Sequence, residues 1–255
     1  MPGINMVAPM SGIAVSAKLK EHYDSYYEGE SPWRTLGALA KADNIVTSCA
    51  SIPHKKILDI GCGEGAVLKR LSDLNFGEDL HSVEISQSAA AAVLQRDIPR
   101  VKECRLFDGY SIPYESGQFD LAILSHVLEH VEYPRKLIFE ASRVADYVFV
   151  EVPMEHTLAL KRDFVLDFTG HINFYSPKTI RRLIQTCDLR VLSQSVTNPS
   201  RALYSFQYGN RGIFKYLAKQ FALATSEAVA CALFTYHCSI VCTKAWTNAR
   251  TCHKI

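Results

Sequence analysis

The sequence predicts an α/β protein built around a mostly parallel sheet of seven strands, and two observations support this. From residue 56 onward, short apolar segments alternate with helical patterns, which requires such a sheet with helices on both faces. In addition, segment 57–65 (ILDIGCGEG) places three glycines at alternate positions between a strand and a helix. Glycine lets a ligand approach the backbone, and the following helix presents unpaired N–H groups. We therefore expect a polar or nucleotide-like ligand at this turn.

The individual elements follow from the same patterns. The predicted strands are Lys56–Ile60, His81–Ile85, Val101–Phe107, Phe119–Ser125, Tyr147–Val152, Leu189–Val196 and His237–Thr243. The fourth of these is nearly all apolar, which indicates a central strand buried on both faces. The predicted helices are Pro32–Ala50, Ala66–Leu74, Gln87–Gln95, Pro134–Val144 and Ser176–Cys187. In such a sheet, ligands bind beyond the carboxyl ends of the strands.

We expect one domain with additions at both ends. Residues 51–245 form the domain, with a helical insert at about 208–233 between the last two strands, and 246–255 form a tail. Residues 1–50 form a helical extension, which contains the tyrosine-rich helix Lys18–Glu28 and the helix that Pro32 opens. Two alternatives stay open for these helices: a cap over the ligand pocket, or a cover for one face of the sheet.

The composition is that of a soluble globular protein. The 255 residues are 48% hydrophobic and 21% charged, and the net charge of +2 gives no reason to expect a nucleic-acid partner. The most apolar window, Phe221–Phe234, is too short to span a bilayer and contains Glu227, so we expect no membrane association and a cytoplasmic protein. Eight cysteines without a C-x-x-C pair favour buried reduced thiols over a metal site. The oligomeric state stays open.

Acidic residues follow the first three predicted strands. Asp59 precedes the glycine turn, Glu84 ends the second strand, and Asp108 with Gly109 follows the third. A carboxylate offers two acceptor oxygens, which suits the hydroxyls of a ribose. The G-x-G-x-x-A spacing also fits a dinucleotide fingerprint, but three carboxylates would repel a pyrophosphate. They favour a cationic nucleoside such as S-adenosylmethionine over NAD.

Four segments resemble the successive motifs of class I S-adenosylmethionine-dependent methyltransferases. They are 57–65 (ILDIGCGEG), 83–86 (VEIS), 107–109 (FDG) and 119–131 (FDLAILSHVLEHV). Segment 170–192 resembles the later part of the small-molecule branch, of methyltransferase type 11/23. The resemblance covers about residues 50–195. It implies a Rossmann-like fold and an enzyme whose cofactor is S-adenosylmethionine and whose product is S-adenosylhomocysteine.

The same resemblance implies roles for single residues. Asp59 would lie near the cofactor's ammonium group, Glu84 would hold the ribose hydroxyls, and Asp108 would accept the adenine amino group. Two alternatives stay open: Glu84 as a solvated acid at a strand end, and Asp108 as a turn residue. From position alone, Arg34 or Lys41 would pair with the cofactor's carboxylate. The full cofactor-binding set is Asp59, Gly61, Cys62, Gly63, Glu84, Ile85, Asp108, Gly109, Ser125, His126 and Arg34.

Methyl transfer from a sulfonium is an in-line displacement, so alignment and exclusion of water matter most. A protonated oxygen or nitrogen nucleophile also needs a base, which favours histidine. Among His126, His130, His156 and His171, we predict His171 and His130 as catalytic. A hydrogen bond that anchors the loop is the alternative role for His171. His126 and His130 are spaced i, i+4, but no third ligand is indicated nearby, so no metal is predicted.

Two absences favour a small-molecule acceptor. The fourth strand is not followed by the Asn/Asp-Pro-Pro-aromatic motif of nucleobase and protein N-methylation, and no Pro-Cys pair offers a thiolate for pyrimidines. We expect Tyr23, Tyr27, Trp33 and His171 to bind the substrate, unless the aromatic residues simply pack the first helices. The prediction is methylation of an oxygen or nitrogen atom of a metabolite, in biosynthesis. The alternatives are a protein or RNA methyltransferase, a non-catalytic cofactor-binding scaffold and, least favoured, an NAD-dependent oxidoreductase.

Overall fold

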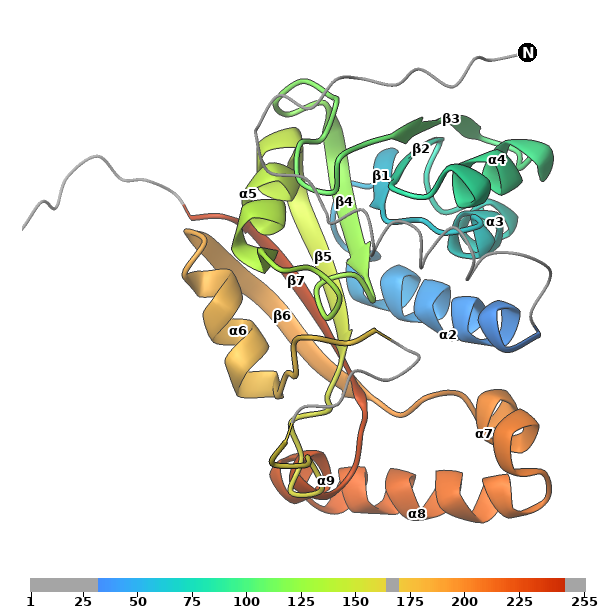
Figure 1. Ribbon diagram of the computed structural model, residues 1–255, viewed down its shortest axis with the longest axis vertical. Helices are drawn as coiled ribbons and strands as arrows, with labels where there is room; N and C mark the ends of the chain where they lie inside the picture. Colours follow the sequence, from blue (N-terminus) through green and yellow to red (C-terminus); the bar gives the residue numbers. More distant parts are fainter. Residues whose placement is uncertain (1–31, 164–169, 246–255) are drawn as a thin grey trace, which may run out of the picture.

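The computed structural model describes residues 32–163 and 170–245, and these form one seven-stranded sheet with helices on both faces (Figure 1). The strands are β1 (Lys56–Ile60), β2 (Asp79–Glu84), β3 (Val101–Leu106), β4 (Phe119–Ser125), β5 (Ala145–Pro153), β6 (Leu189–Thr197) and β7 (His237–Lys244). The helices are α2 (Pro32–Cys49), α3 (Ala66–Asp73), α4 (Gln87–Gln95), α5 (Pro134–Val144), α6 (Pro177–Gln185), α7 (Arg201–Tyr208), α8 (Arg211–Thr225) and α9 (Glu227–Leu233). The predicted fold class is confirmed.

The strand order is β3-β2-β1-β4-β5-β7-β6, with β7 antiparallel to both of its neighbours. In the register, Ser125 of β4 lies beside Glu151 of β5, Glu151 lies beside Ser239 of β7, and His237 lies beside Thr197 of β6. The carboxyl ends of β4, β5 and β6 therefore meet the amino end of β7. We call this side of the sheet, together with the carboxyl ends of β1–β3, the C-terminal edge.

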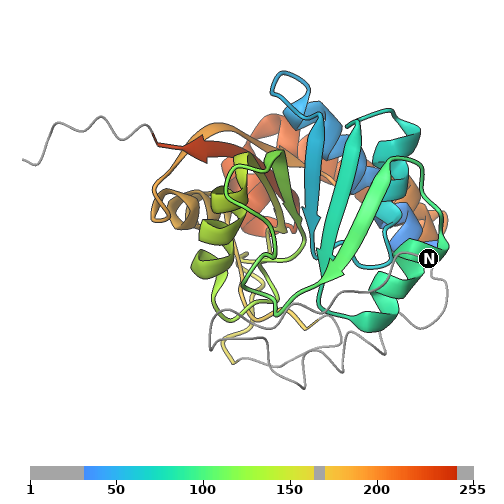
Figure 2. The ribbon, with the colours of Figure 1, turned by 90° about the horizontal axis from the view of Figure 1, so that it is seen from above.

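Two apolar cores lie on opposite faces of the sheet, and Figure 2 shows the helices on either side of the strands. One core joins the sheet to α5 and α6, and the other joins it to α2, α3 and α4. Helix α2 contributes Ala42, Ile45 and Cys49 to the second core, all fully buried. This helix therefore covers a face of the sheet, as one of the two alternatives predicted. The tyrosine-rich helix, with Tyr23 and Tyr27, lies outside the described residues.

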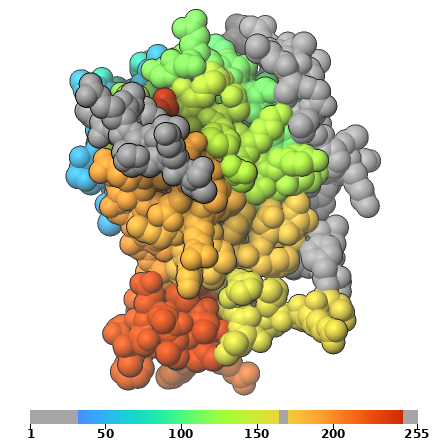
Figure 3. Space-filling view, turned by 90° about the vertical axis from the view of Figure 1, so that its left-hand side faces the viewer, coloured from blue at the N-terminus to red at the C-terminus, as the bar shows by residue number. Residues whose placement is uncertain are grey.

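The insert between β6 and β7 is longer than predicted. It contains three helices and begins with α7 at Arg201 rather than near residue 208. The missed signal is Ser200, whose hydroxyl accepts a hydrogen bond from the Leu203 N–H as the N-cap of α7. Figure 3 shows α8 and α9 at one end of the molecule, beside segment 153–163, where the Leu158 N–H donates to the Ala232 carbonyl.

Two further observations concern the predictions about membrane helices and cysteines. Among the described helices, none combines the length and the apolar character that crossing a membrane requires. The described cysteines are all buried and form no disulfide. The division into an extension, a domain and a tail stays a prediction.

Candidate active site

The glycine turn after β1 has the backbone that the sequence predicted. Gly61 and Gly63 have φ angles of 73° and 55°, and the Gly61 N–H donates to the Val83 carbonyl. A Cβ on Gly61 would lie 2.9 Å from the Val127 side chain. The turn therefore needs glycine there for conformation and for space, and it brings the backbone of β1 against the segment that follows β4.

Glu84 ties β2 to this turn. Its carboxylate accepts hydrogen bonds from the N–H groups of Gly63 (2.7 Å), Ile85 (2.8 Å) and Ser86 (3.0 Å). The side chain is buried, so the alternative of a solvated acid at a strand end is wrong. The Glu84 carboxylate therefore lies within one hydrogen bond of the turn, and its ribose-binding role stays a prediction.

Asp59 is a buried acid with an unused oxygen. It is 3% exposed, and its Oδ2 has no hydrogen-bond partner among the described residues. Burial, and then the nearby Glu84 carboxylate, raise the pKa of Asp59 to about 7, although Lys41 opposes the shift. Lys41, from α2, also lies within electrostatic reach of Glu129 and Glu151, while burial lowers its own pKa. Because these acidic side chains outnumber Lys41, this part of the C-terminal edge favours a ligand that carries a positive charge.

Three other predicted cofactor residues are placed more precisely by the structure. Arg34, also on α2, forms an ion pair with Glu64 of the turn at 3.3 Å. The Cys62 side chain points into the core, with its sulfur 3.9 Å from that of Cys104, so its backbone is the part that remains at the turn. In Ser125 the hydroxyl oxygen is buried and has no hydrogen-bond partner among the described residues.

The geometry of Asp108 allows both roles that the sequence left open, namely a turn residue and an acceptor for the adenine amino group. Its Oδ1 accepts hydrogen bonds from the N–H groups of Tyr110 (2.8 Å) and Ser111 (2.6 Å), which closes the turn at Gly109. Its Oδ2 is buried and has no partner in the described part of the chain. One oxygen therefore shapes the turn, and the other is placed to accept a hydrogen bond from a ligand.

His126 lies between two buried carboxylates. Its Nδ1 is 3.2 Å from Glu129 Oε1 and its Nε2 is 3.2 Å from Glu151 Oε1. Its φ is 58°, and its N–H donates to the Glu151 carbonyl, which fixes the position of the ring. Burial alone would raise the pKa of both acids, but the nearby His126 imidazole outweighs it and holds each pKa at about 2.

Glu151 and His237 complete this group, and sequence reasoning missed both. The second oxygen of Glu151, Oε2, accepts hydrogen bonds from Asn44 Nδ2 (2.7 Å) and Ser239 Oγ (2.9 Å). Its Oε1 is 4.0 Å from His237 Nδ1, and the His237 ring lies edge-on to that of His126 with centroids 4.6 Å apart. The signal for Glu151 was present, because a lone acid interrupts the apolar run YVFVEV of β5.

The two histidines predicted as catalytic lie together. The centroids of the His130 and His171 rings are 4.7 Å apart. His171 Nδ1 is 2.7 Å from the Glu155 carboxylate, and His130 Nδ1 is 3.3 Å from the Gly170 carbonyl. Burial lowers the pKa of His130, and the negative charge of Glu129 opposes this shift.

The loop that carries His171 is anchored by a different residue. Asn173 Nδ2 donates to the carbonyls of Leu128 (3.0 Å) and Val131 (2.8 Å). The N–H groups of Ile172 and Asn173 both donate to the Glu129 carbonyl. These contacts hold the loop together with the His171–Glu155 pair, so both roles predicted for His171 stay open.

Trp33 supports the packing alternative more than a substrate-binding role. Its ring contacts Phe206 of α7 with centroids 6.4 Å apart, so it links α2 to the insert. With 39% of its surface exposed, it is not enclosed among the described residues. Tyr23 and Tyr27 lie outside the described residues, and their predicted roles are not tested.

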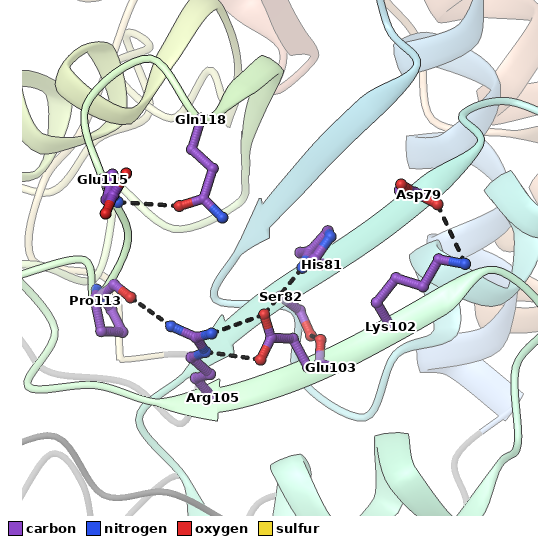
Figure 4. Close-up of polar contacts among 9 residues, drawn as sticks. All are labelled: Asp79, His81, Ser82, Lys102, Glu103, Arg105, Pro113, Glu115 and Gln118. Atoms are coloured by element: carbon purple, nitrogen blue, oxygen red, sulfur yellow. Dashed lines mark hydrogen bonds and ion pairs between the residues drawn. The ribbon is translucent and has the colours of Figure 1, made fainter. Parts of the chain in front are cut away.

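A second group of polar side chains lies on β2 and β3 (Figure 4), and we call it the Arg105 cluster. Arg105 donates to both oxygens of Glu103 and to the Pro113 carbonyl, and His81 Nδ1 is 3.2 Å from Glu103 Oε1. A surface cavity of about 1440 Å³ adjoins this cluster and is also lined by Lys56. The hydrogen bonds of the cluster are satisfied within the protein, so we do not place the active site there.

Comparison with known proteins agrees with the motif arrangement. Residues 37–194 match a family model described as a methyltransferase domain. The mitochondrial ubiquinone biosynthesis O-methyltransferase of Candida albicans is 27% identical over 120 residues, which are 44% of this chain and 35% of that protein. Ajmaline N-methyltransferase of Rauvolfia serpentina is 33% identical over 102 residues, 36% of this chain and 34% of that protein. The chain thus spans about a third of the length of both curated relatives.

One solved structure shows how far the fold likeness extends. Haemonchus contortus phosphoethanolamine N-methyltransferase 2, in complex with phosphomonomethylethanolamine and S-adenosylhomocysteine, gives a TM-score of 0.63 at 15% identity. The likeness covers 91% of this chain and 61% of that one. At this identity the likeness establishes the fold alone.

Proposed function

This chain belongs to the family of S-adenosylmethionine-dependent methyltransferases, and we propose that it transfers a methyl group to an oxygen or nitrogen atom of a small molecule. When bound, S-adenosylmethionine supplies a methyl carbon that its sulfonium already activates. The chain's own residues would then bind the cofactor, exclude water and hold the acceptor in line.

The observation that carries the proposal is the unpartnered oxygen of Asp59. A buried carboxylate with a pKa near 7 and no partner for Oδ2 among the described residues is costly, unless a ligand supplies a donor or a positive charge. The ammonium group of S-adenosylmethionine supplies both. Asp108 fits the adenine in the same way through its unpartnered Oδ2, and Glu84 fits the ribose because its carboxylate, held by the backbone of the turn, can accept further hydrogen bonds.

His171 is our candidate base. The Glu155 carboxylate at 2.7 Å fixes the orientation and the tautomer of the His171 ring, as a general base requires. His130 lies beside it and would contact the acceptor or the base. In this arrangement the imidazole accepts the proton of an acceptor hydroxyl or amine, and Glu155 stabilises the imidazolium that forms.

A small-molecule acceptor is supported by the absence of the nucleobase and protein N-methylation motif and by the names of the two curated relatives. The competing proposals are a protein or RNA methyltransferase and a scaffold that binds cofactor without turnover. The first predicts binding to RNA with a steep salt dependence. The second predicts that no acceptor in a broad panel consumes the bound cofactor.

Calorimetric titration with S-adenosylhomocysteine tests the cofactor assignment. We expect binding by the native chain, weaker binding by Asp59→Asn, and no effect of Asp73→Asn, a matched change at an aspartate in an exposed ion pair with Lys69. Tight binding of NAD with no heat from S-adenosylhomocysteine or S-adenosylmethionine would overturn the proposal.

A further inference from the structure

Three buried ligand atoms converge at the C-terminal edge without hydrogen-bond partners among the described residues. They are His126 Nε2, Glu151 Oε1 and His237 Nδ1. All three lie within 4.8 Å of one another. We propose that these residues bind one first-row divalent metal ion, with zinc as the first candidate because two imidazoles and a carboxylate suit it.

The fold builds this group from three neighbouring strands. His126 directly follows β4, Glu151 lies near the end of β5, and His237 begins β7. These strands are adjacent in the sheet, and the reversed direction of β7 brings its first residue to the edge where the other two end. Glu151 and His237 stand on paired strands, and the hydrogen bond from the His126 N–H to the Glu151 carbonyl holds His126 beside them, which favours a defined geometry.

The distances suit a metal with little rearrangement. Zinc bonds of about 2.0–2.2 Å in a tetrahedron place ligand atoms roughly 3.3–3.6 Å apart. Glu151 Oε1 is 3.2 Å from His126 Nε2 and 4.0 Å from His237 Nδ1. The two histidine nitrogens lie within 4.8 Å of each other, so a movement of the His237 ring toward Glu151 and His126 would complete the site. Three protein ligands leave one coordination position for water or for an oxygen of the acceptor.

The side chains that contact the proposed ligands are of the kinds that orient ligands in known metal sites. His126 Nδ1 faces Glu129 at 3.2 Å, so a carboxylate lies behind the imidazole. The second oxygen of Glu151 is held by Asn44 and Ser239, which orients Oε1 toward the two histidines. The positive φ of His126 is a strained backbone for a non-glycine residue, and such strain is concentrated at functional sites.

An ion pair of His126 with Glu129 and Glu151, with Lys41 as a further positive charge nearby, is the competing explanation. It gives His237 Nδ1 no hydrogen-bond partner among the described residues. A divalent ion would use that nitrogen. The neighbouring trio of Glu129, His130 and His171 could also hold a metal, but we assign it to the proposed base, because His171 is already paired with Glu155.

Zinc titration of the reduced, chelator-treated full chain tests the proposal without any assay of activity. We expect the native chain to bind zinc, and Glu151→Gln and His237→Gln each to weaken one equivalent by about 100-fold or more. His54→Gln is the matched control, since His54 precedes β1 at the opposite edge of the sheet, and it should bind zinc as the native chain does. Cobalt bound at this site should lack the sulfur-to-cobalt charge-transfer band that thiolate ligands produce.

Circular dichroism and S-adenosylhomocysteine affinity establish that each variant is folded. Undiminished zinc binding by folded Glu151→Gln and His237→Gln, or no binding by the native chain, would overturn the metal site. Either result leaves the cofactor assignment intact, because that assignment rests on Asp59 and is read from a separate titration.

Discussion

The Arg105 cluster and the group around His126 contain similar residues, but they differ in whether their polar atoms have hydrogen-bond partners. Each combines histidine with glutamate, and each is partly or fully buried. In the Arg105 cluster, both Glu103 oxygens accept hydrogen bonds and all three guanidinium nitrogens donate. Around His126, by contrast, buried atoms of Glu129, Glu151 and His237 lack hydrogen-bond partners among the described residues.

The difference separates a structural network from a binding site. A buried polar atom without a partner costs about 1–3 kcal/mol, so a folded protein retains few of them without a reason. The C-terminal edge collects several, whereas the Arg105 cluster satisfies its own. We therefore expect substitutions at the edge to impair binding and turnover, and substitutions in the Arg105 cluster to affect stability alone.

The largest expected effect is on turnover. His171→Ala should lower kcat by about 10²–10⁴-fold, the usual contribution of a general base, with cofactor affinity nearly unchanged. His81→Ala is the matched control, because His81 is equally buried and also faces a glutamate, but in the Arg105 cluster. Steady-state kinetics with an identified acceptor would measure both, and a fully active His171→Ala would remove this residue from the mechanism.

The next effect is on cofactor affinity. Glu84→Ala should weaken S-adenosylhomocysteine binding by roughly 2–4 kcal/mol, because two charge-assisted hydrogen bonds to the ribose are lost. Calorimetry measures this directly. Glu103→Ala should leave the affinity unchanged, and equal losses in the two variants would erase the distinction between the two regions.

Asp59 should show a pH-dependent cost to stability. Its pKa is raised to about 7, so the folded state binds more protons than the unfolded state between about pH 4 and pH 7. Stability is therefore lost as the pH rises through this window. Asp59→Asn should raise the free energy of unfolding of the cofactor-free protein by about 2–4 kcal/mol at pH 8 and have little effect at pH 4. Denaturant unfolding at the two pH values measures this, and a gain independent of pH would contradict it.

The smallest expected effect is a loss of stability, in contrast to the gain expected for Asp59→Asn. Glu103→Gln should lower the free energy of unfolding by about 1 kcal/mol, because it breaks the paired hydrogen bonds of Arg105, whose side chain is 33% exposed. Urea unfolding of this variant beside Asp59→Asn at pH 8 places the two changes in one experiment. A stabilised Glu103→Gln would mean that the Arg105 cluster is not the satisfied network that its contacts indicate.

The sequence predicted the sheet and the first half of the site because both depend on local patterns. Strand β4 and helices α4 and α5 have the predicted bounds, since apolar runs, Ser86 as N-cap and Pro134 mark them. The glycine turn, Glu84 and Asp108 could be named because each lies at, or just beyond, the end of a recognisable strand. Helix α7 was missed because its N-cap, Ser200, was not recognised as the start of a helix.

The second half of the site could not be predicted in this way. Glu151 and His237 lie far apart in the sequence and meet because β7 pairs with β5. The prediction of no metal considered only residues near His126 and His130 along the chain and stays a prediction, whereas Glu151 and His237 come close to His126 across the sheet. His130 and His171 were named, but their partners Glu129 and Glu155 were not given roles.

The antiparallel strand β7 also determines when this edge can be finished. It lies between β5 and β6, so β6 has no neighbour in the sheet until the last described strand has been made and inserted. During synthesis, β1–β5 can pair while His237 is still missing from the edge. Insertion of β7 would therefore bring His237 to the edge and give β6 its neighbour at the same time.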